Sequence, residues 1–455
     1  MKYFIKCSEA IWLDLQRSLW DRPDVETAGA LFVKTINMGD AVVLVIKGMR
    51  RLADADYRER RSNFLELSPS WINGCCREAR ALGLGVLTIH THLHSGPPAF
   101  SWADDQGDSR LLPAMQARVP EAAVGSIVVS TDDAVARVLD VGDFAAARLT
   151  IVGTRVATFP KVRTPAAEAH ARQVLALGTD GQAALADLRV GIVGFGGTGS
   201  VVHMLLRHLG VKWIQAVEPD VFERSNLSRI VGAHLSDPAG SISKIAIAHR
   251  LARDIQGDHT ELPAFAHALI DEATALQLSS CDLIFSCVDR LLPRALLNTL
   301  AYTANIPVID MGSAFRVDDT GRIVSQGGKV AIVGPGRTCL WCWGDLDANR
   351  IRAETLPPEE RSELAARGYV EGADVPQPAV IAFNAEIAAA AVIEAMRLVT
   401  AFAGGEAPPE RLNFDFARGT IVRVRGHIRE ECPFCGAGVT ANIGSVNLRS
   451  DAPTS

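Results

Sequence analysis

Apolar residues form short runs along the first 150 residues, and polar or glycine-containing stretches separate these runs. Strand-length runs occur at residues 30–35, 41–48, 84–92 and 125–130. From residue 188 to about residue 315, strand-length runs alternate with helical patterns, which is typical of a parallel sheet covered by helices. The pattern therefore predicts an α/β protein, with one unit at residues 1–150 and a second unit with a parallel sheet after it.

Changes in composition mark the boundaries between the predicted parts. Residues 151–170 are predicted to be a linker, residues 171–437 the second domain, and residues 438–455 a flexible tail. The polar, proline-containing stretch at residues 345–378 is interpreted as a surface crossover. The most apolar helix, at about residues 382–402, contains Glu386, Glu394 and Arg397. We interpret it as a buried helix rather than a membrane span.

A glycine-rich loop follows the first strand of the second domain. Residues 190–193 are predicted to form a buried strand, and a helix is expected from about residue 200 to residue 209. Between them, Gly194, Gly196 and Gly199 form G-x-G-x-x-G, a pattern that brings backbone amides close to a phosphate. Glu218 ends the next strand, where an acidic residue can hold a ribose. This signal alone fits an NAD enzyme equally well.

The polar residues that follow the ribose acid favour a different chemistry. Asn226, Arg229 and Lys244 come soon after it, and Asp289 follows another apolar strand. A hydride-transfer site has little use for such groups, whereas a site that stabilises charge on an attacked α-phosphorus and holds Mg²⁺ needs them. The glycine loop carries no G-x-x-x-x-G-K-[ST] pattern, so γ-phosphoryl transfer of the P-loop kind is not expected.

Together these motifs resemble the ubiquitin-activating-enzyme-like adenylyltransferases, which include MoeB, ThiF and HesA. The resemblance covers about residues 168–436 and rests on ARQVLALGTDGQAAL, GFGGTGS, E-P-D, SNLSR, Lys244, CVDR and two C-x-x-C pairs. It implies a Rossmann-like adenylation domain that uses ATP and Mg²⁺ to adenylate the C-terminal glycine of a small ubiquitin-like, β-grasp protein.

The resemblance also implies roles for individual residues. Glu218 would hold the ribose hydroxyls, and Asn226 and Arg229 would contact the phosphates. Lys244 would neutralise charge on the triphosphate, and Asp289 would position Mg²⁺ near the attacked phosphorus.

One further residue of the resemblance implies an oligomer. Arg172 matches an arginine that family members insert into the partner subunit's site, which implies a homodimer. Two positions depart from the family pattern, because Glu218 stands where an aspartate is usual and Ile230 stands where a glutamine often follows the SNL-x-R arginine.

Three histidines at alternate positions indicate separate chemistry in the first unit. His90, His92 and His94 lie in GVLTIHTHLHSGPPAFSWADD, with Ser101 and Asp104 behind them. Alternate strand residues point the same way, so two of these histidines can converge on one metal ion. Asp104 could complete a three-ligand zinc site that leaves the fourth position for water, and Glu26 is the candidate base.

This segment resembles the JAMM (MPN+) metalloproteases, which remove ubiquitin-like proteins from lysine amines. The resemblance implies that His90, His92 and Asp104 hold a catalytic Zn²⁺, with Glu26 as the base and Ser101 bonded to the tetrahedral intermediate. The usual gap of seven residues before the serine is eight from His92 and six from His94. We therefore favour His90 with His92, because the apolar strand runs into them, and keep His92 with His94 as the alternative.

The cysteines predict a second zinc site. Two C-x-x-C pairs form a closed, structural Cys₄ site, which would tie the end of the catalytic sheet to the C-terminal part: Cys339, Cys342, Cys432 and Cys435. The other cysteines are at positions 7, 75, 76, 281 and 287, and none lies in the 345–378 crossover, where thioester-forming relatives carry theirs. We therefore predict an acyl-adenylate but no thioester on the crossover, with a carrier or an acceptor completing the transfer.

The composition bears on the expected partners and cellular compartment rather than on the reaction. The net charge of −6, without a basic cluster, argues against nucleic-acid binding. Nine cysteines and an N-terminus without a signal-peptide core indicate a reducing, cytoplasmic compartment, and no membrane association is expected.

Four functions remain open at this point. The first is a bifunctional enzyme that adenylates the C-terminal glycine of a ubiquitin-like protein and also removes or matures that protein as a zinc peptidase. The second activates a sulfur carrier or a short peptide instead. In the third, the first domain is a non-catalytic docking module. The fourth, an NAD-dependent dehydrogenase, rests on the glycine loop alone.

Overall fold

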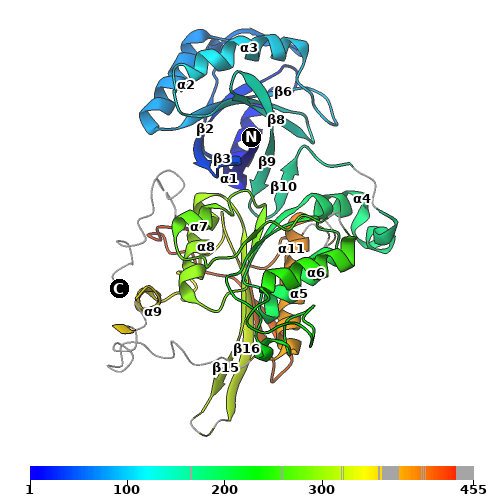
Figure 1. The fold of residues 1–455 in the computed structure, drawn as a ribbon. Coiled ribbons are helices and arrows are strands. Elements are labelled where there is room, and N and C mark those ends of the chain that lie inside the picture. The colour runs from blue at the N-terminus through cyan, green and yellow to red at the C-terminus, as the bar shows by residue number, and fades with distance from the viewer. Residues whose placement is uncertain are drawn as a thin grey trace. The chain divides into compact units, whose positions relative to one another are not determined.

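The structure is a computed structural model, and it describes residues 1–163, 167–257, 260–318, 320, 322–356, 359–360, 379–400, 402, 404 and 406–436. The chain divides into two compact units, residues 1–163 and residues 164–455. Figure 1 shows the chain coloured from its N-terminus to its C-terminus.

The first unit contains one large sheet, a two-stranded hairpin and three α-helices within residues 1–163 (Figure 1). Its elements are β1 (Lys2–Ser8), α1 (Glu9–Leu19), β2 (Ala28–Asn37), β3 (Ala41–Arg51), η1 (Asp54–Asp56), β4 (Tyr57–Arg60), β5 (Leu65–Leu67), α2 (Pro69–Leu82), β6 (Gly85–Thr91), α3 (Trp102–Gln116), β7 (Val124–Val129), β8 (Ala134–Asp140), β9 (Asp143–Val152) and β10 (Val156–Phe159). The strand order is β1-β3-β2-β6-β7-β8-β9-β10, and β1 pairs with β9 as well as with β3, so the sheet closes upon itself.

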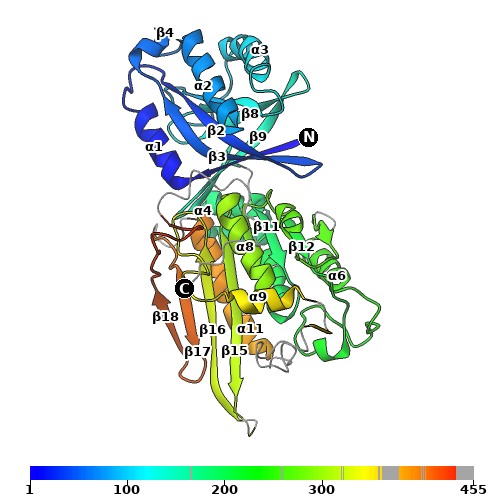
Figure 2. The same cartoon turned by 90° about the vertical axis from the view of Figure 1, so that its left-hand side faces the viewer.

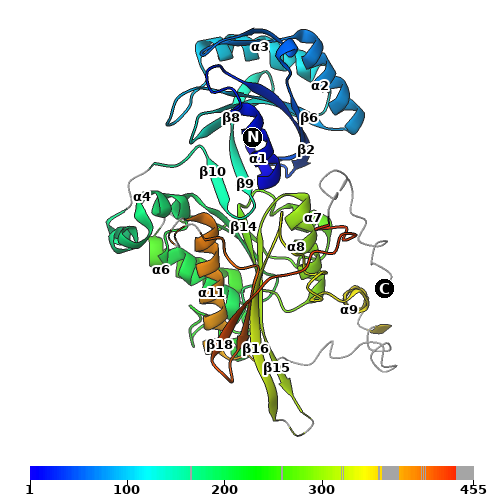
Figure 3. The ribbon, with the colours of Figure 1, turned by 180° about the vertical axis from the view of Figure 1, so that it is seen from behind.

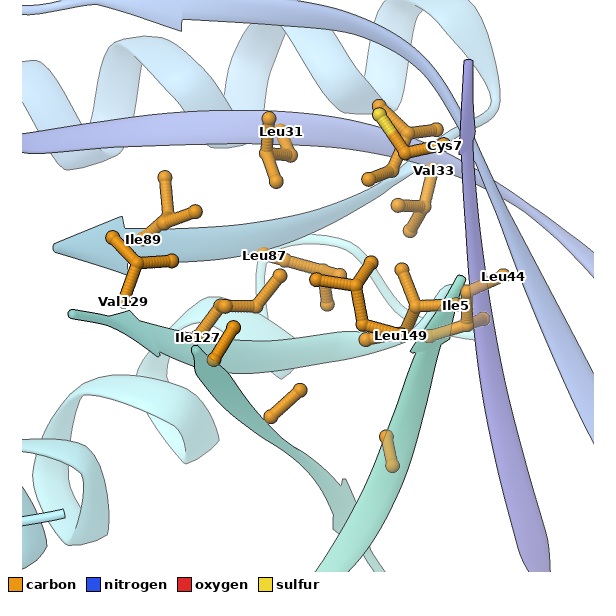
Figure 4. Packing of buried hydrophobic residues seen from close by; sticks show 14 of the residues in the cluster. Ile5, Cys7, Leu31, Val33, Leu44, Leu87, Ile89, Ile127, Val129 and Leu149 are labelled. Atoms are coloured by element: carbon orange, nitrogen blue, oxygen red, sulfur yellow. The ribbon is translucent and has the colours of Figure 1, made fainter. Parts of the chain in front are cut away.

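Alternate strand residues divide the apolar side chains of this unit between two cores. On β2, Leu31 and Val33 face a core that contains Leu15 of α1, whereas Ala30 and Phe32 face α2 and α3. Figure 4 shows the first core, where side chains from β1, β2, β6, β7 and β9 converge. Burying each large aliphatic side chain contributes about 1.5–3 kcal/mol, so the two cores fix β6 and α3 in place. These two elements carry the predicted zinc ligands.

The second unit is a twisted sheet with helices on both faces (Figures 1 and 3). Its elements are η2 (Glu168–His170), α4 (Ala171–Asp187), β11 (Arg189–Val193), α5 (Gly197–His208), β12 (Trp213–Val217), η3 (Arg224–Asn226), α6 (Lys244–Gln256), β13 (Ala264–Phe265), α7 (Glu272–Leu276), β14 (Leu283–Ser286), α8 (Leu291–Thr303), β15 (Val308–Val317), β16 (Ile323–Val333), α9 (Ala348–Glu354), α11 (Ile381–Val399), β17 (Arg411–Asp415) and β18 (Thr420–Val424).

The strand order of the second sheet creates a crevice for a ligand. The order is β13-β12-β11-β14-β15-β16-β17-β18, parallel from β13 to β15 and antiparallel from β15 to β18. The chain moves from β11 outward through β12 to β13, and then returns to β14 on the other side of β11. Ligands of such folds bind at the carboxyl ends of the strands where this reversal occurs, which is between β11 and β14 here. The sheet is therefore Rossmann-like.

Helices cover both faces of the second sheet. The helices α5, α6 and α11 lie on one face, and α7, α8 and α9 lie on the other (Figures 1 and 3). The parallel strands are buried on both faces, as all four residues of β14 show. The antiparallel strands β15 and β16 extend beyond their neighbours as a long hairpin (Figure 2).

Several element boundaries differ from the sequence-based expectations. The segment 151–170 contains the end of β9, the strand β10 and the turn η2, so the first sheet continues to Phe159. The helix after the glycine loop begins at Gly197, three residues before the predicted start, because the glycines form its first turn. The predicted crossover includes α9, while residues 357–358 and 361–378 lie outside the described residues, as does the predicted tail 438–455.

The long apolar helix α11 ends at Val399 and packs against α5 and β15, as expected for a buried helix. Across the part of the chain that the structure describes, no helix combines the length and apolar character needed to cross a membrane.

Candidate nucleotide and metal sites

The glycine loop fills the turn between β11 and α5. Gly194 has a positive φ of 90°, and a Cβ there would lie 2.7 Å from the carbonyl oxygen of Cys287. A Cβ on Gly199 would lie 1.9 Å from the oxygen of Gly194, so neither position accepts a side chain. A Cβ on Gly196 would meet no atom within 4 Å, so the loop backbone is open on that side. The free amides of the α5 N-terminus at this point suit a phosphate.

The acidic residue after β12 lies against the glycine loop. Glu218 is 4% exposed, and its carboxylate accepts hydrogen bonds from the Phe195 amide at 2.5 Å and from the Asp220 amide at 2.9 Å. Lys244, at the start of α6, places Nζ 2.7 Å from Oδ2 of Asp220 and 3.5 Å from Oε1 of Glu218. The structure thus brings Glu218 and Lys244 together beside the loop, with the lysine paired to two carboxylates.

The SNLSR segment combines a local structural role with one half-buried cation, Arg229. Asn226 is buried, and its side-chain oxygen accepts a hydrogen bond from the Glu223 amide at 3.2 Å, which caps η3. Arg229 donates to the Ser225 carbonyl at 3.2 Å, and its Cβ lies 3.4 Å from where a Cβ of Gly197 would be. Capping therefore accounts for Asn226 without a ligand, whereas Arg229 lies beside the phosphate-binding end of α5.

Asp289 lies in the turn after the carboxyl end of β14, and β14 is the strand that pairs with β11. It is exposed, and the preceding turn approaches the glycine loop through the Cys287 carbonyl. Sequence reasoning missed Arg294 of α8, which is 11% exposed and donates to the Val288 carbonyl at 2.8 Å. The signal that could have revealed it is a single arginine within the apolar helix LLPRALLNTL.

Arg172 lies in the first turn of α4 and is exposed, and its neighbour Gln173 donates to the carbonyl of His208 at 2.8 Å. Gly178, with a φ of 72°, kinks the helix six residues later. The arginine side chain is thus exposed on the surface of the second unit.

The four predicted structural zinc ligands converge. All four sulfur atoms lie within 4.8 Å of one another, with Cys339 Sγ 3.5 Å from Cys432 Sγ and Cys342 Sγ 3.6 Å from Cys435 Sγ. Tetrahedral Zn–S bonds of about 2.3 Å require sulfur atoms about 3.8 Å apart, so this donor set fits Zn²⁺. Arg429 Nε lies 3.4 Å from Cys342 Sγ and would support a thiolate there.

In the first unit, two histidines and one aspartate converge. His90 is the next-to-last residue of β6, His92 directly follows the strand, and Asp104 lies in the first turn of α3. His90 Nε2 lies 3.0 Å from Oδ1 of Asp104, and His92 Nε2 lies 3.4 Å from Oδ2. The three ligand atoms lie within 4.8 Å of one another, which fits a three-ligand catalytic zinc site. His94 is exposed, and its Nδ1 lies 3.0 Å from the Ser95 carbonyl oxygen, outside this group.

Glu26 lies next to these groups because of the pairing of β2 with β6. Ala28 is opposite His90. Beyond this pair, the Thr91 amide donates to the Thr27 carbonyl and the Thr27 amide donates to Oγ1 of Thr91, so Glu26 comes opposite His92. Glu26 is 7% exposed, and burial raises its pKa although the two histidines act in the opposite direction. A carboxylate with a raised pKa suits general-base chemistry near neutral pH.

The metal-ligand group also shifts the pKa values of its members. The hydrogen bond to Asp104 raises the pKa of His92. Burial acts to raise the pKa of Asp104, but hydrogen bonds with His90 and His92 outweigh it and hold that pKa well below its usual range. Asp104 is therefore ionised as a hard oxygen ligand requires.

Ser101 has a structural function in addition to its predicted catalytic one. It is the N-cap of α3, where its Oγ accepts from the Asp104 amide at 3.2 Å and its amide donates to Oδ2 of Asp104 at 2.6 Å. The S-x-x-D pattern is thus a capping box as well as a candidate catalytic pair. The structure brings Ser101 to Asp104 but gives it no contact with the histidines.

Arg137 of β8 was also missed by sequence reasoning. Its guanidinium lies between the rings of Phe100 and Phe144, at 3.7 and 4.3 Å from their centroids. It donates to Asp108 at 2.7 Å and to Asp105 at 2.5 Å, both on α3. This buried cation fixes the helix that carries Ser101 and Asp104.

The second unit is a Rossmann-like α/β domain with a four-cysteine cluster, and comparison with known sequences identifies its class. The sequence model of the ThiF family matches residues 170–434, and this chain belongs to the ThiF family.

Three relatives show how far the sequence similarity extends. "Adenylyltransferase and sulfurtransferase uba4" of Aspergillus niger is 26% identical over 62% of this chain and 55% of its own length. "SAMP-activating enzyme E1" of Haloferax volcanii is 26% identical over 60% of this chain and 88% of its own length. "Molybdopterin-synthase adenylyltransferase" of Salmonella typhimurium is 34% identical over 32% of this chain and 58% of its own length. The chain thus spans little more than half of two of these relatives.

Solved structures with a similar fold include E. coli MccB, which is 18% identical with a TM-score of 0.47 over 61% of this chain and 75% of that chain. The complex of MccB with ATP is 19% identical with a TM-score of 0.45 over 60% of this chain and 75% of that chain.

Proposed function

We propose that this protein adenylates the C-terminal glycine of a small ubiquitin-like, β-grasp protein with ATP. We propose further that its first unit is a JAMM-type zinc peptidase that cleaves after the same glycine. The observation that carries the proposal is the presence of two separate residue groups in one chain. One group surrounds the glycine loop of a ThiF-family domain, and the other joins His90, His92 and Asp104 beside Glu26.

The adenylation step follows from the groups around the glycine loop. A carboxylate oxygen of the terminal glycine attacks the α-phosphorus of ATP, and the bond from that phosphorus to the oxygen that bridges to the β-phosphate breaks. The products are the acyl-adenylate and pyrophosphate. Arg229 and Lys244 neutralise charge on the phosphates, and Glu218 holds the ribose hydroxyls. Lys244 exchanges part of its pairing with Asp220 for the triphosphate as ATP enters.

The remaining groups of this site have supporting functions. Asp289 would hold Mg²⁺, which neutralises charge on the leaving pyrophosphate. Asn226 keeps η3 folded next to Arg229, in addition to any phosphate contact. Arg172, exposed on α4, completes the site of a second copy in a homodimer.

The peptidase step follows from the groups at the end of β6. Zn²⁺ held by His90, His92 and Asp104 would polarise a water molecule and the scissile carbonyl. Glu26 takes the proton from the attacking water and delivers it to the leaving amine as the C–N bond breaks. Ser101 donates its O–H to the oxygen that gains charge, while its Oγ can continue to accept from the Asp104 amide.

The relatives support the choice of substrate. The Haloferax volcanii protein is named a SAMP-activating enzyme, and a Bacillus subtilis relative is named "Sulfur carrier protein ThiS adenylyltransferase". A small protein with a free C-terminal glycine would serve both units here, because one unit activates the carboxylate that the other releases. None of the described cysteines lies in residues 345–356 or 359–360, so a carrier or a direct acceptor would finish the transfer. Both activities suit the reducing cytoplasm.

ATP–pyrophosphate exchange tests the adenylation proposal. We expect exchange that depends on a β-grasp protein ending in glycine and is lost when that glycine is deleted. ATP–pyrophosphate exchange that stays at the background level although ATP is bound would contradict the adenylation proposal. The same assay with a sulfur carrier or a short peptide in place of the ubiquitin-like protein tests the alternative substrates, because the true substrate should support exchange.

A cleavage assay tests the first unit separately. A β-grasp protein with extra residues beyond its glycine should be cut after the glycine by the zinc-loaded protein. If it binds but is never cut, the first unit is a docking module. The dehydrogenase alternative rests on the glycine loop alone, and membership of the ThiF family argues against it.

A further inference from the structure

Helix α8 begins directly after Asp289, and its first amides are capped from a distant part of the chain. The N-cap residue Arg290 provides no side-chain hydrogen bond. Instead, the Glu354 carboxylate at the end of α9 accepts from the Leu291 amide at 3.0 Å and from the Leu292 amide at 2.9 Å. A carboxylate at this position satisfies two unpaired donors and interacts favourably with the helix dipole. The backbone on the C-terminal side of Asp289 is thereby held.

The backbone on the N-terminal side of Asp289 is held by Arg294. Its guanidinium donates to the Val288 carbonyl at 2.8 Å, to the Met311 carbonyl at 3.2 Å and to Oδ2 of Asp310 at 2.8 Å. Asp310 is fully buried, so its charge requires these partners. Residues 288 and 291–292 are therefore fixed while the Asp289 side chain between them remains exposed.

Both attachments lead to the segment that follows Cys339 and Cys342. Lys329 joins Asp310 to Asp345, at 3.2 and 2.6 Å, and Asp345 also pairs with Arg411 at 3.0 Å. Asp345 follows Cys342 by three residues, and Glu354 ends the helix that comes next. The side chains of this network are at most 16% exposed, and Asp310 and Asp345 each pair with two cations, so each buried carboxylate is neutralised within the network.

We infer that the segment Cys339–Glu354 positions the Asp289 loop, through Glu354 directly and through Asp345, Lys329, Asp310 and Arg294. Metal binding at the four cysteines therefore controls how well Asp289 can hold a divalent cation in the nucleotide site. This inference rests on the proposed role of Asp289 in binding Mg²⁺. Glu354 and Arg294 are positioning residues, because they act through the backbone of the loop.

Hydrogen–deuterium exchange of the full-length protein tests the attachment itself. Glu354→Ala should speed exchange of the Leu291 and Leu292 amides by about tenfold, because their acceptor is lost. Glu354→Gln, which keeps one acceptor oxygen, should give a smaller effect. The matched control is Asp271→Ala, which removes the carboxylate that caps α7 through the Thr274 amide at 2.8 Å. Unchanged exchange in Glu354→Ala would overturn the inference.

The affinity for Mn²⁺, measured by electron paramagnetic resonance in the presence of α,β-methylene ATP, tests whether the attachment affects cation binding at Asp289. Glu354→Ala and Arg294→Lys should weaken Mn²⁺ binding by about tenfold, as supporting residues of metal sites do. The affinity for the nucleotide without a divalent cation should stay the same in these variants. In the control Asp271→Ala, the affinities for Mn²⁺ and for the nucleotide should both stay the same. Faster exchange with unchanged Mn²⁺ affinity would overturn the positioning role and leave only a helix cap.

Removal of the metal at the cysteines tests the remote link. Chelation, or the variant Cys342→Ser, should speed exchange across residues 288–292 and weaken Mn²⁺ binding, with residues 194–199 unaffected. No change at residues 288–292 would overturn the link. These readouts need no turnover, so they separate this inference from the proposed function: a protein without pyrophosphate exchange can still pass them, and an active adenylyltransferase can still fail them.

Discussion

Oδ1 of Asp104 lies 3.0 Å from Nε2 of His90, although Asp104 lies in the first turn of helix α3 and His90 is the next-to-last residue of strand β6. The closed sheet and the core under α3 hold these two elements together. The contact brings together two of the three ligand atoms of the proposed Zn²⁺ site.

Zinc content tests both metal sites in one measurement. We expect about two Zn²⁺ per chain by mass spectrometry of the metal, about one in His90→Ala or Asp104→Ala, and about one in Cys432→Ser. His94→Ala is the control, because His94 lies outside the group, and it should keep both ions. Loss of zinc in His94→Ala with retention in His90→Ala would favour the alternative histidine pair.

Glu26 is expected to affect the peptidase rate without affecting metal binding. Glu26→Gln should retain zinc and lower kcat for cleavage after the terminal glycine by about 10²–10⁴-fold, since the proton acceptor is lost. Glu66→Gln on β5 serves as the control, because Glu66 is exposed and pairs only with Arg58 at the surface. A Glu26→Gln variant as fast as the wild type would exclude this base.

Lys244 is expected to affect nucleotide binding. Lys244→Ala removes a cation from the phosphates and leaves Glu218 and Asp220 without their counter-ion, so ATP affinity should fall by about 10²-fold. Lys212→Ala, an exposed lysine before the amino end of β12, should leave ATP affinity unchanged. Calorimetry of α,β-methylene ATP measures both variants, and equal losses in the two would indicate a general charge effect.

The pair of Asp237 and Arg250 gives the second unit a pH-dependent stability. Arg250 donates to both carboxylate oxygens, at 2.8 and 2.7 Å, and lowers the pKa of Asp237 to about 2. The unfolded chain has the ordinary pKa of about 3.9, so the stabilisation is complete above that pH and is lost as the pH falls towards about 2. The pair holds the loop between Arg229 and Lys244.

Asp237→Asn should therefore lower the free energy of unfolding by about 2 kcal/mol at pH 7, because a buried charge-assisted pair is broken. The difference between the wild type and the variant should shrink at pH 3. Urea unfolding at pH 7 and at pH 3, monitored by hydrogen–deuterium exchange of residues 231–243, measures this difference. A difference that stays constant or grows at pH 3 would contradict the assigned pKa shift.

Local sequence patterns were sufficient to predict the glycine turn, the cysteine cluster and the fold of the second unit. The glycine spacing predicts the β11–α5 turn because steric contacts with Cys287 and Gly194 exclude side chains at Gly194 and Gly199. The two C-x-x-C pairs predict the cysteine cluster because each pair fixes two ligands within one turn. The Rossmann-like fold follows from alternating strand and helix patterns.

Other features depend on contacts between distant residues, which no local pattern reveals. Glu354 caps α8 across 62 residues, and Arg137 holds Asp108 across 29 residues. The short strand β10 lies in a segment with a linker-like composition, and it forms because β9 provides an antiparallel partner. Such residues were missed because their function depends on sheet register and helix packing.

The proposed adenylation is measured by the mass of the β-grasp protein after incubation with ATP, Mg²⁺ and this protein, with pyrophosphatase present. We predict a product that carries one adenylyl group on its terminal glycine, formed by the wild type and absent with Asp289→Asn. An unmodified glycine carboxylate, with ATP bound to the wild-type protein, would contradict the account.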